Sequence, residues 1–277
     1  MTGFNAAVGT VIDWLQAPLA GLPPLVGVAL WSVPVAVFAL WVFGKTSNQA
    51  RIAEVKRRIA ASLFEIRLFN DDLRAIARAQ WEILGHVVRY QGLALVPMVF
   101  ILPPLVVLMV HLHQFYGFRG LAPGEHALLR VELAEAGSAR PEMTVDVPSG
   151  LSLATPALWV PALGELNWEL AADAPGDYEL AFTIGGTSTT KAVRVTDRVV
   201  RLSPERPPHA FVDQLEWPSE PPLPPEGPIR RITVDYPEGA VGLLGWSWQW
   251  AFAWMVVFFV LTMVFAVVLK GRMGVEL

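Results

Sequence analysis

The chain has 277 residues, of which 53% are hydrophobic and only 17% are charged, and its formal net charge is −4. It contains no cysteine, so disulfides, zinc thiolates, iron–sulfur clusters and cysteine nucleophiles are excluded. Hydrophobic residues gather in three long runs, and each run is long enough for a membrane helix, which takes about 20 residues. We therefore expect an integral membrane α-helical protein with three transmembrane helices.

The segment before the first run, residues 1–24, carries apolar side chains at helical spacing. They are Phe4, Val8, Val11, Ile12 and Leu15. This pattern predicts a short amphipathic helix on the membrane surface, ended by Pro23 and Pro24. The alternative is a disordered N-terminal tail.

The three membrane helices are expected within residues 25–44, 92–116 and 246–269, with apolar centres at 25–43, 93–115 and 248–269. Aromatic residues with a polar atom mark the ends of such helices. Tyr116 closes the second helix, and four tryptophans open the third: Trp246, Trp248, Trp250 and Trp254.

The charge of the connecting segments predicts their orientation. Residues 45–91 hold nine Lys and Arg against five Asp and Glu, whereas residues 116–247 hold ten against eighteen. The tail, 270–277, adds Lys270 and Arg272. Basic loops stay in the cytoplasm. We therefore expect a multi-pass protein of the bacterial inner membrane, with the N-terminus outside and the C-terminus inside.

Few residues within the expected membrane helices are polar or able to bend them. Pro97, Pro103 and Pro104 remove backbone donors from the second helix, which indicates either a bent helix lining a cavity or a tolerated kink. The candidate polar positions are Ser32 in the first helix and Gln249 and Thr262 in the third.

Residues 45–91 are predicted to form a cytoplasmic hairpin of two helices, joined by a capped turn at 70–72. The expected packing faces are Ile52, Val55, Ile59, Leu63, Ile66 and Phe69 in the first helix, and Leu73, Ile76, Ala77, Leu84 and Val87 in the second. The second helix is expected to continue into the membrane.

The basic face of this hairpin supplies candidate contacts to lipids or to a client protein. These residues are Lys45, Arg51, Lys56, Arg57, Arg58, Arg67, Arg74 and Arg78. An acidic nascent chain and ribosomal RNA are further possible partners, and DNA is not expected. Alternatively, the charges only set the orientation in the membrane.

The segment between the second and third membrane helices is predicted to be an extracytoplasmic β-sandwich-like domain, residues 117–203. Its expected strands are 128–133, 143–147, 166–170, 178–184 and 191–202, with a hairpin turn at Gly185 and Gly186. Residues 204–245 follow as a proline-rich strap, a spacer or a docking ligand, with a final strand at 229–236. Such a domain suits an extracytoplasmic protein partner.

Motifs of enzymes are missing from the sequence, so we expect neither an enzyme nor a cofactor. No HExxH, GxSxG or Walker pattern occurs. His111 and His113 are two residues apart, so on a helix they point in different directions and make poor metal ligands. They are expected at the outer end of the second membrane helix.

The order of these elements carries a family resemblance. The segment VFGKTSNQARI (42–52), continued to Arg89 and Tyr90, and the flanking membrane helices resemble the YidC/Oxa/Get superfamily of membrane-protein insertases. The resemblance covers residues 25–115 and 246–272 and is nearest to the minimal three-span members, the archaeal YidC-like proteins and the insertase subunit of the ER membrane complex. It implies that the β domain is an insertion and that a groove between the helices eases polar segments across the bilayer.

Two functions follow as expectations. The first is membrane-protein insertion or assembly of a membrane complex, with membrane lipids and a membrane-protein client as partners. The second is a non-catalytic scaffold or accessory subunit whose β domain binds an extracytoplasmic partner. An accessory role for an enzyme or transporter is a third alternative.

Overall fold

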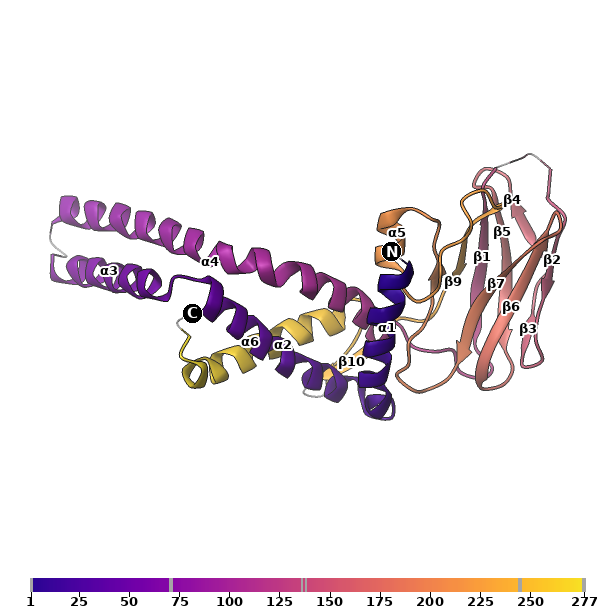
Figure 1. Cartoon of the computed structure of the whole chain (residues 1–277), viewed down its shortest axis with the longest axis horizontal. Helices are drawn as coiled ribbons and strands as arrows, with labels where there is room; N and C mark the ends of the chain where they lie inside the picture. The colour runs from indigo at the N-terminus through magenta and orange to yellow at the C-terminus, as the bar shows by residue number, and fades with distance from the viewer. Residues whose placement is uncertain (1, 70–71, 136, 138, 244–245, 276–277) are drawn as a thin grey trace. The chain divides into compact units, whose positions relative to one another are not determined.

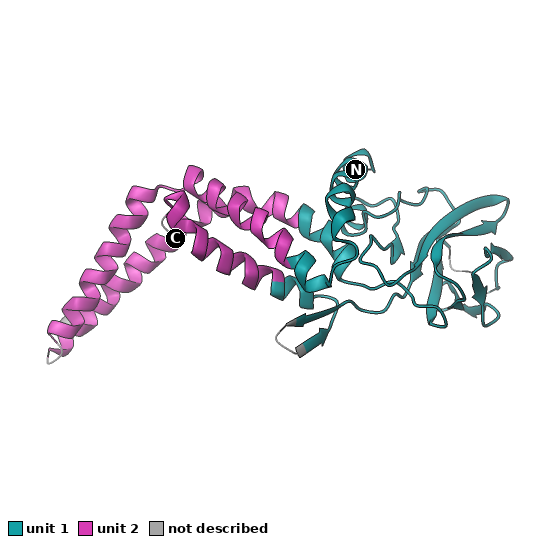
Figure 2. Ribbon diagram, turned by 90° about the horizontal axis from the view of Figure 1, so that it is seen from below, with its two compact units in different colours: residues 1–28, 107–257 teal, residues 29–106, 258–277 magenta. Residues whose placement is uncertain are grey.

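The structure is a computed structural model that describes residues 2–69, 72–135, 137, 139–243 and 246–275. The chain divides into two compact units (Figure 2). The first comprises residues 1–28 and 107–257, and the second comprises residues 29–106 and 258–277. Three helices, α2, α4 and α6, run from one unit into the other.

The N-terminal helix α1 (Thr2–Gln16) and the short 3-10 helix η1 (Ala17–Leu19) confirm the predicted helix. One face of α1 is buried in the first unit through Asn5, Gly9, Ile12 and Gln16. The opposite face exposes large apolar side chains: Phe4, Val11, Trp14 and Leu15. The buried face therefore combines Ile12 with small and polar residues, whereas most of the large apolar residues of α1 point outward.

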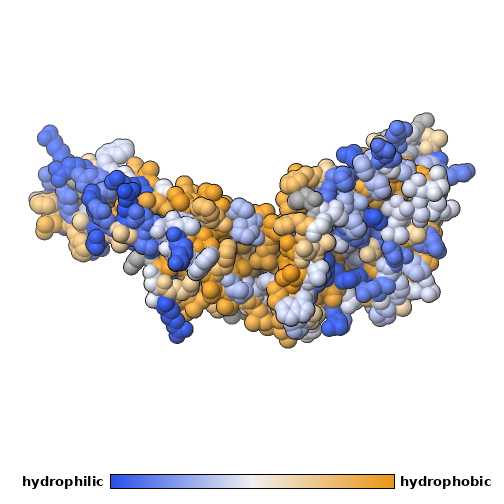
Figure 3. Space-filling view, viewed as in Figure 1, coloured by the Kyte–Doolittle hydropathy of each residue, from blue (hydrophilic) through white to orange (hydrophobic). Residues whose placement is uncertain are grey.

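Three helices are long and apolar enough to cross a membrane: α2 (Pro24–Thr46), the part of α4 (Leu73–Tyr116) from Ile76 onward, and α6 (Ala253–Met273). Hydrophobic residues cover this part of the molecule in the space-filling view (Figure 3). The predicted start of the third helix at Trp248 is wrong. Residues Trp246–Gln249 form strand β11, which pairs with β10 (Ala240–Leu243), and α6 begins only at Ala253.

The sequence around β11 explains this error. Tryptophan recurs there at every second position, 246, 248 and 250, which is the period of a strand. Hydropathy averaged over a membrane-length window cannot separate this short strand from the helix that follows it.

The hairpin is formed by α3 (Gln49–Leu68) and the first part of α4 (Figure 1). The two helices run antiparallel, because Arg78 pairs with Glu65 at 2.8 Å and the Lys56 ammonium lies 5.9 Å from the centre of the Tyr90 ring. Of the predicted turn, Asn70 and Asp71 lie outside the described residues. Asp72 caps α4 by accepting a hydrogen bond from the Arg74 amide at 2.8 Å.

The predicted packing faces of the hairpin are only partly right. Ile52 and Val55 are buried, as are the small residues Ser62 and Ala79, which were not expected there. Leu63 in α3, Phe69 directly after it, and Leu73 and Leu84 in α4 are instead exposed by 47% or more. The small buried side chains let the helices approach closely, and this moves larger apolar residues to the outside.

Two antiparallel sheets form the β domain (Figure 1). The larger sheet has the order β3-β5-β1-β9-β8, with β4 also paired to β5, and the smaller has the order β2-β6-β7. The bounds are β1 His126–Leu133, β2 Met143–Asp146, β3 Leu151–Leu153, β4 Leu158–Val160, β5 Glu165–Ala172, β6 Gly176–Ile184, β7 Thr187–Val195, β8 Glu205–Arg206 and β9 Ile229–Val234. Side chains of both sheets share one buried core, in which the rings of Trp168 and Phe182 lie 6.4 Å apart.

The β6–β7 hairpin confirms the predicted turn, since Gly185 and Gly186 both have positive φ, 55° and 81°. The predicted strand 191–202 is too long, because β7 ends at Val195. Beyond it the backbone bonds to other elements. The amides of Val199 and Leu202 donate to the carbonyls of Ala20, at 3.0 Å, and Gln114, at 2.8 Å. The chain thus leaves the sheet to meet η1 and α4.

The proline-rich segment 204–228 lies on the β domain, with β8 and the short helix α5 (Phe211–Glu216) inside it. Buried Lys191 on β7 donates to Glu220 of this segment at 3.1 Å and to the Ser203 hydroxyl at 2.9 Å. Arg206 of the segment donates to the Thr190 hydroxyl on β7 at 3.2 Å. These bonds support the strap among the three alternatives, since they fasten the segment to its own sheet.

Burial shifts two ionisable groups near the strap. It lowers the pKa of Lys191, against the opposing pull of the Glu220 carboxylate. It raises the pKa of Glu205 to about 7, although Arg231 lies 3.2 Å from this carboxylate. For both groups, the loss of hydration on burial shifts the pKa more than the nearby opposite charge shifts it back.

Candidate functional site

The basic residues of the hairpin are spread along it rather than gathered in one cluster. Seven of the eight candidates are exposed, and Lys56, the eighth, is half-buried over Tyr90. Arg58 is engaged by Glu54 at 2.5 Å, and Arg78 by Glu65 and Glu82. Such exposed pairs contribute little to stability, so these arginines are available to a partner.

The sequence placed Leu73, Ala77 and Leu84 on a buried packing face, but in the structure they belong to an exposed apolar stripe on α4. Its residues follow one another at spacings of three, four or seven: Leu73, Ala77, Trp81, Leu84, Val88, Leu95, Val99, Leu102 and Val106. This spacing puts all of them on one side of the helix. Trp81 is 73% exposed and Val99 68%, so the stripe is open both where α4 runs beside α3 and beyond the hairpin. By the same spacing Arg74, Arg78 and Arg89 follow its edge.

The three polar residues predicted within the membrane helices lie on different elements of the structure. Ser32 is fully buried, and its hydroxyl donates to the Phe258 carbonyl at 3.3 Å. In a regular helix this carbonyl accepts from the amide of Thr262, so Ser32 of α2 contacts the turn of α6 that ends at Thr262. Gln249 does not join them, because it lies on strand β11. The prediction that Gln249 is a polar position of the third helix is therefore wrong.

The three prolines lie inside one unbroken helix, α4. Pro97 is buried, whereas Pro103 and Pro104 are exposed. Because proline has no N–H, the carbonyls four residues earlier, of Leu93, Val99 and Phe100, receive no helical hydrogen bond from these positions. Val99 belongs to the apolar stripe, so a backbone acceptor interrupts the apolar surface there.

A second candidate site lies in the first unit, around Arg201. This residue follows β7 and joins three elements. Its Nε donates to Asp13 at 2.8 Å, its Nη2 to the Gly9 carbonyl at 3.1 Å, and its Nη1 lies 3.1 Å from His111 Nδ1. Its guanidinium also covers the ring of Phe115 at 5.0 Å. The Arg201 side chain is only 11% exposed, so it fastens α1 and the end of α4 to the β domain.

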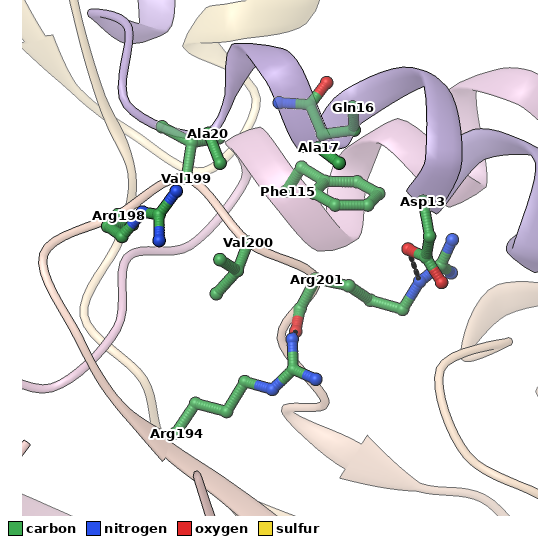
Figure 4. A pocket seen from close by; sticks show the side chains of 10 residues that line it. All are labelled: Asp13, Gln16, Ala17, Ala20, Phe115, Arg194, Arg198, Val199, Val200 and Arg201. Carbon is green, nitrogen blue, oxygen red and sulfur yellow. Dashed lines mark hydrogen bonds and ion pairs between the residues drawn. The ribbon is translucent and has the colours of Figure 1, made fainter. Parts of the chain in front are cut away.

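Beside Arg201 lies a cavity of about 410 Å³ (Figure 4). Its walls combine charged, polar and apolar side chains: Asp13, Gln16, Ala17, Ala20, Phe115, Arg194, Arg198, Val199, Val200 and Arg201. The helical residues line one side, and Arg194, Arg198 and Val200 line another (Figure 4). Arg198 and Val199 also line a neighbouring cavity of about 300 Å³, which reaches Pro24 and Tyr116.

The two histidines of α4 have separate partners, in keeping with their spacing. His111 is buried against Arg201, whereas His113 accepts a hydrogen bond from Trp254 Nε1 at 3.2 Å and stacks on Phe252. Both serve as packing residues at the end of α4. Within the described parts of the chain, no group of three or more His, Asp or Glu could hold a metal ion.

Comparison with known proteins leaves the site to be judged by its geometry. No protein-family model, curated protein or solved structure matches the chain. Sequence reasoning named the hairpin arginines but passed over Asp13, Arg194, Arg198 and Arg201. One signal was present, because Asp13 is the only charged residue before Lys45 and a lone charge in an apolar segment needs a partner.

Proposed function

We propose that the protein assists the insertion of membrane proteins or the assembly of membrane complexes, as the resemblance to the YidC/Oxa/Get superfamily implies. The observation that carries this proposal is the apolar stripe of α4. It starts on the hairpin and continues without a break of helix into the segment long and apolar enough to cross a membrane. A hydrophobic client segment that binds at Trp81 would meet the same kind of surface at Val99.

The basic residues at the edge of the stripe complement this surface. A client segment with an acidic flank would meet Arg74, Arg78 and Arg89 in the hairpin, where the side chains of all three are exposed. Orientation with the hairpin in the cytoplasm, in a bacterial inner membrane, is part of the proposal, because a client leaves the ribosome on that side. The charge of residues 45–91 supports it.

Photo-crosslinking tests the proposal. A photoreactive amino acid replaces Trp81, Leu84 or Val88 in the stripe, and the exposed residue Glu82 serves as the matched position on another side of the same helix turns. We expect crosslinks to hydrophobic nascent segments from the stripe and few from the matched position. Equal yields from the stripe and the matched position, or unchanged membrane levels of small clients after depletion of the protein, would contradict an insertase function.

The alternative is a scaffold subunit whose β domain binds a partner. The observation that favours it is the scarcity of polar groups between α2 and α6, where Ser32 already bonds to Phe258. A stripe that crosslinks to one resident membrane protein, which also co-purifies in mild detergent, would favour the scaffold over the insertase. A chain that always purifies alone would count against the scaffold.

A further inference from the structure

The cavity beside Arg201 has the chemistry of an anion site. Three arginines line it, and Asp13 is the one carboxylate in its wall. Arg201 is balanced by Asp13, and Arg194 is 3.3 Å from Asp177, whose side chain is 76% exposed and therefore a weak counter-charge. Asp197, the neighbour of Arg198 in sequence, lines the adjoining cavity, which Arg198 also lines, and does not line this one. The cavity wall thus keeps a positive excess centred on Arg198.

The rest of the cavity wall is apolar, and the cavity has the size of a small-ligand pocket. Ala17, Ala20, Phe115, Val199 and Val200 supply this wall. A volume of about 410 Å³ lies within the usual range for ligand pockets. A ligand that fits both walls carries a negative group and an apolar part.

The cavity also lies at the ends of membrane-length helices. Phe115 is the last residue but one of α4, and Ala20 lies four residues before the first residue of α2. Phospholipid headgroups occupy this depth when such helices cross a bilayer. Helix α1, which supplies Asp13 and Gln16 to the cavity, exposes Trp14 and Leu15 on its opposite face. Those side chains are suited to the boundary between headgroups and acyl chains.

We propose that this cavity binds the phosphate of an anionic phospholipid headgroup, with Arg198 as the principal ligand and the apolar wall facing the glycerol and first acyl carbons. Arg194, whose Nη1 donates to the Arg201 carbonyl at 2.7 Å, supplies a second positive charge. Arginine is suited to this role because its planar guanidinium donates two parallel hydrogen bonds to a phosphate. Bound lipid would hold α1, the end of α4 and the β domain against the membrane surface. This inference does not rest on the proposed insertase function.

Binding is measured on the full chain in a non-ionic detergent. The probes are dihexanoyl phosphatidylglycerol, its zwitterionic phosphatidylcholine analogue, and glycerol phosphate, which has the anionic group but no acyl chain. We expect phosphatidylglycerol to bind most tightly, and Arg198→Gln and Arg194→Gln each to weaken it roughly tenfold. Arg140→Gln, an equal charge change on an exposed loop away from the cavity, is the control and should have no effect.

Three outcomes overturn the proposal. Equal binding of phosphatidylglycerol and phosphatidylcholine removes the preference for an anion. Unchanged binding in Arg198→Gln, with thermal unfolding like that of the parent protein, places the lipid elsewhere. Glycerol phosphate that binds as tightly as the lipid assigns the cavity to a soluble phosphate compound instead.

Discussion

The hydroxyl of Tyr116, at the end of α4, lies so close to Gly27 in α2 that a Cβ at Gly27 would be 2.3 Å from it. The same hydroxyl donates to Gln16 Oε1 at 3.0 Å, so it cannot move away without losing that bond. Helices α1, α2 and α4 therefore meet at the hydroxyl oxygen of Tyr116.

Gly27→Ala is expected to lower the free energy of unfolding by about 1–3 kcal/mol, the usual cost of overpacking. Tyr116→Phe removes the hydroxyl and leaves Cζ as the nearest atom, at 3.1 Å, so the double variant should recover part of the loss. Thermal unfolding in detergent measures both. Gly21→Ala is the control, since a Cβ there has nothing within 4 Å. Equal losses in the single and double variants would contradict the proposed contact.

Arg201→Gln is expected to release α1 from the first unit, because it removes the charged bonds to Asp13 and to the Gly9 carbonyl. Each bond to a charged group contributes about 1.5–3 kcal/mol. Hydrogen exchange of the α1 amides should quicken, while exchange in β5 and β6 stays as it was. Arg230→Gln, at an exposed ion pair on β9, should leave α1 unchanged. Protection of α1 that persists in Arg201→Gln would rule out Arg201 as its anchor.

Lys191→Met is expected to cost roughly 3–5 kcal/mol, because it leaves Glu220 with a nearly buried charge and no ammonium partner. Lys191→Met combined with Glu220→Gln should cost clearly less, since the unpaired charge is then also removed. Urea unfolding followed by tryptophan fluorescence distinguishes these variants. A double variant as unstable as the single one would show that the ion pair itself contributes the stability.

Glu205 predicts a pH dependence of unfolding. Its pKa is raised by burial from 4.5 to about 7, so the folded state binds this proton more tightly than the unfolded state. The contribution to stability is complete below about pH 4.5 and is lost as the pH rises through about 7. The loss amounts to about 3 kcal/mol. Glu205→Gln should flatten the stability curve over this range. A curve identical to that of the parent protein would show that Glu205 is not the titrating group.

Thr262→Val tests the polar turn of α6. The Thr262 hydroxyl oxygen is buried and has no hydrogen-bond partner among the described residues, so an isosteric methyl should leave stability unchanged or raise it. Ser32→Ala, which removes the bond to the Phe258 carbonyl, should cost about 1 kcal/mol. Thermal unfolding in lipid nanodiscs is the measurement. A clear loss in Thr262→Val would reveal a partner for this hydroxyl in the membrane.

The helices were predictable because their signals are local. The spacing of Phe4, Val8 and Val11 predicts α1, and Gly185 with Gly186 predicts the β6–β7 turn. The third membrane helix was misplaced at its start because Trp246–Gln249 is apolar enough for a membrane and alternates like a strand. Short strands such as β3 and β8 carry too few residues for a period to show.

The candidate sites were harder to predict because they depend on distant contacts. Arg201 meets Asp13 across 188 positions of the sequence, and no local pattern indicates that pairing. The exposure of the apolar stripe was not predicted, for a different reason. Periodicity alone cannot tell which of two adjacent faces of a helix packs inward. In this hairpin the face with the small residues Ser62 and Ala79 is the buried one.

Helix α4 is continuous from Leu73 to Tyr116, so the hairpin and the apolar segment beyond it share one helical backbone. A load on the hairpin would therefore reach Leu95 through the helix itself. The turns before Pro97, Pro103 and Pro104 each lack a backbone hydrogen bond, so they resist bending least. Bending under such a load would begin there, where the stripe would meet lipid.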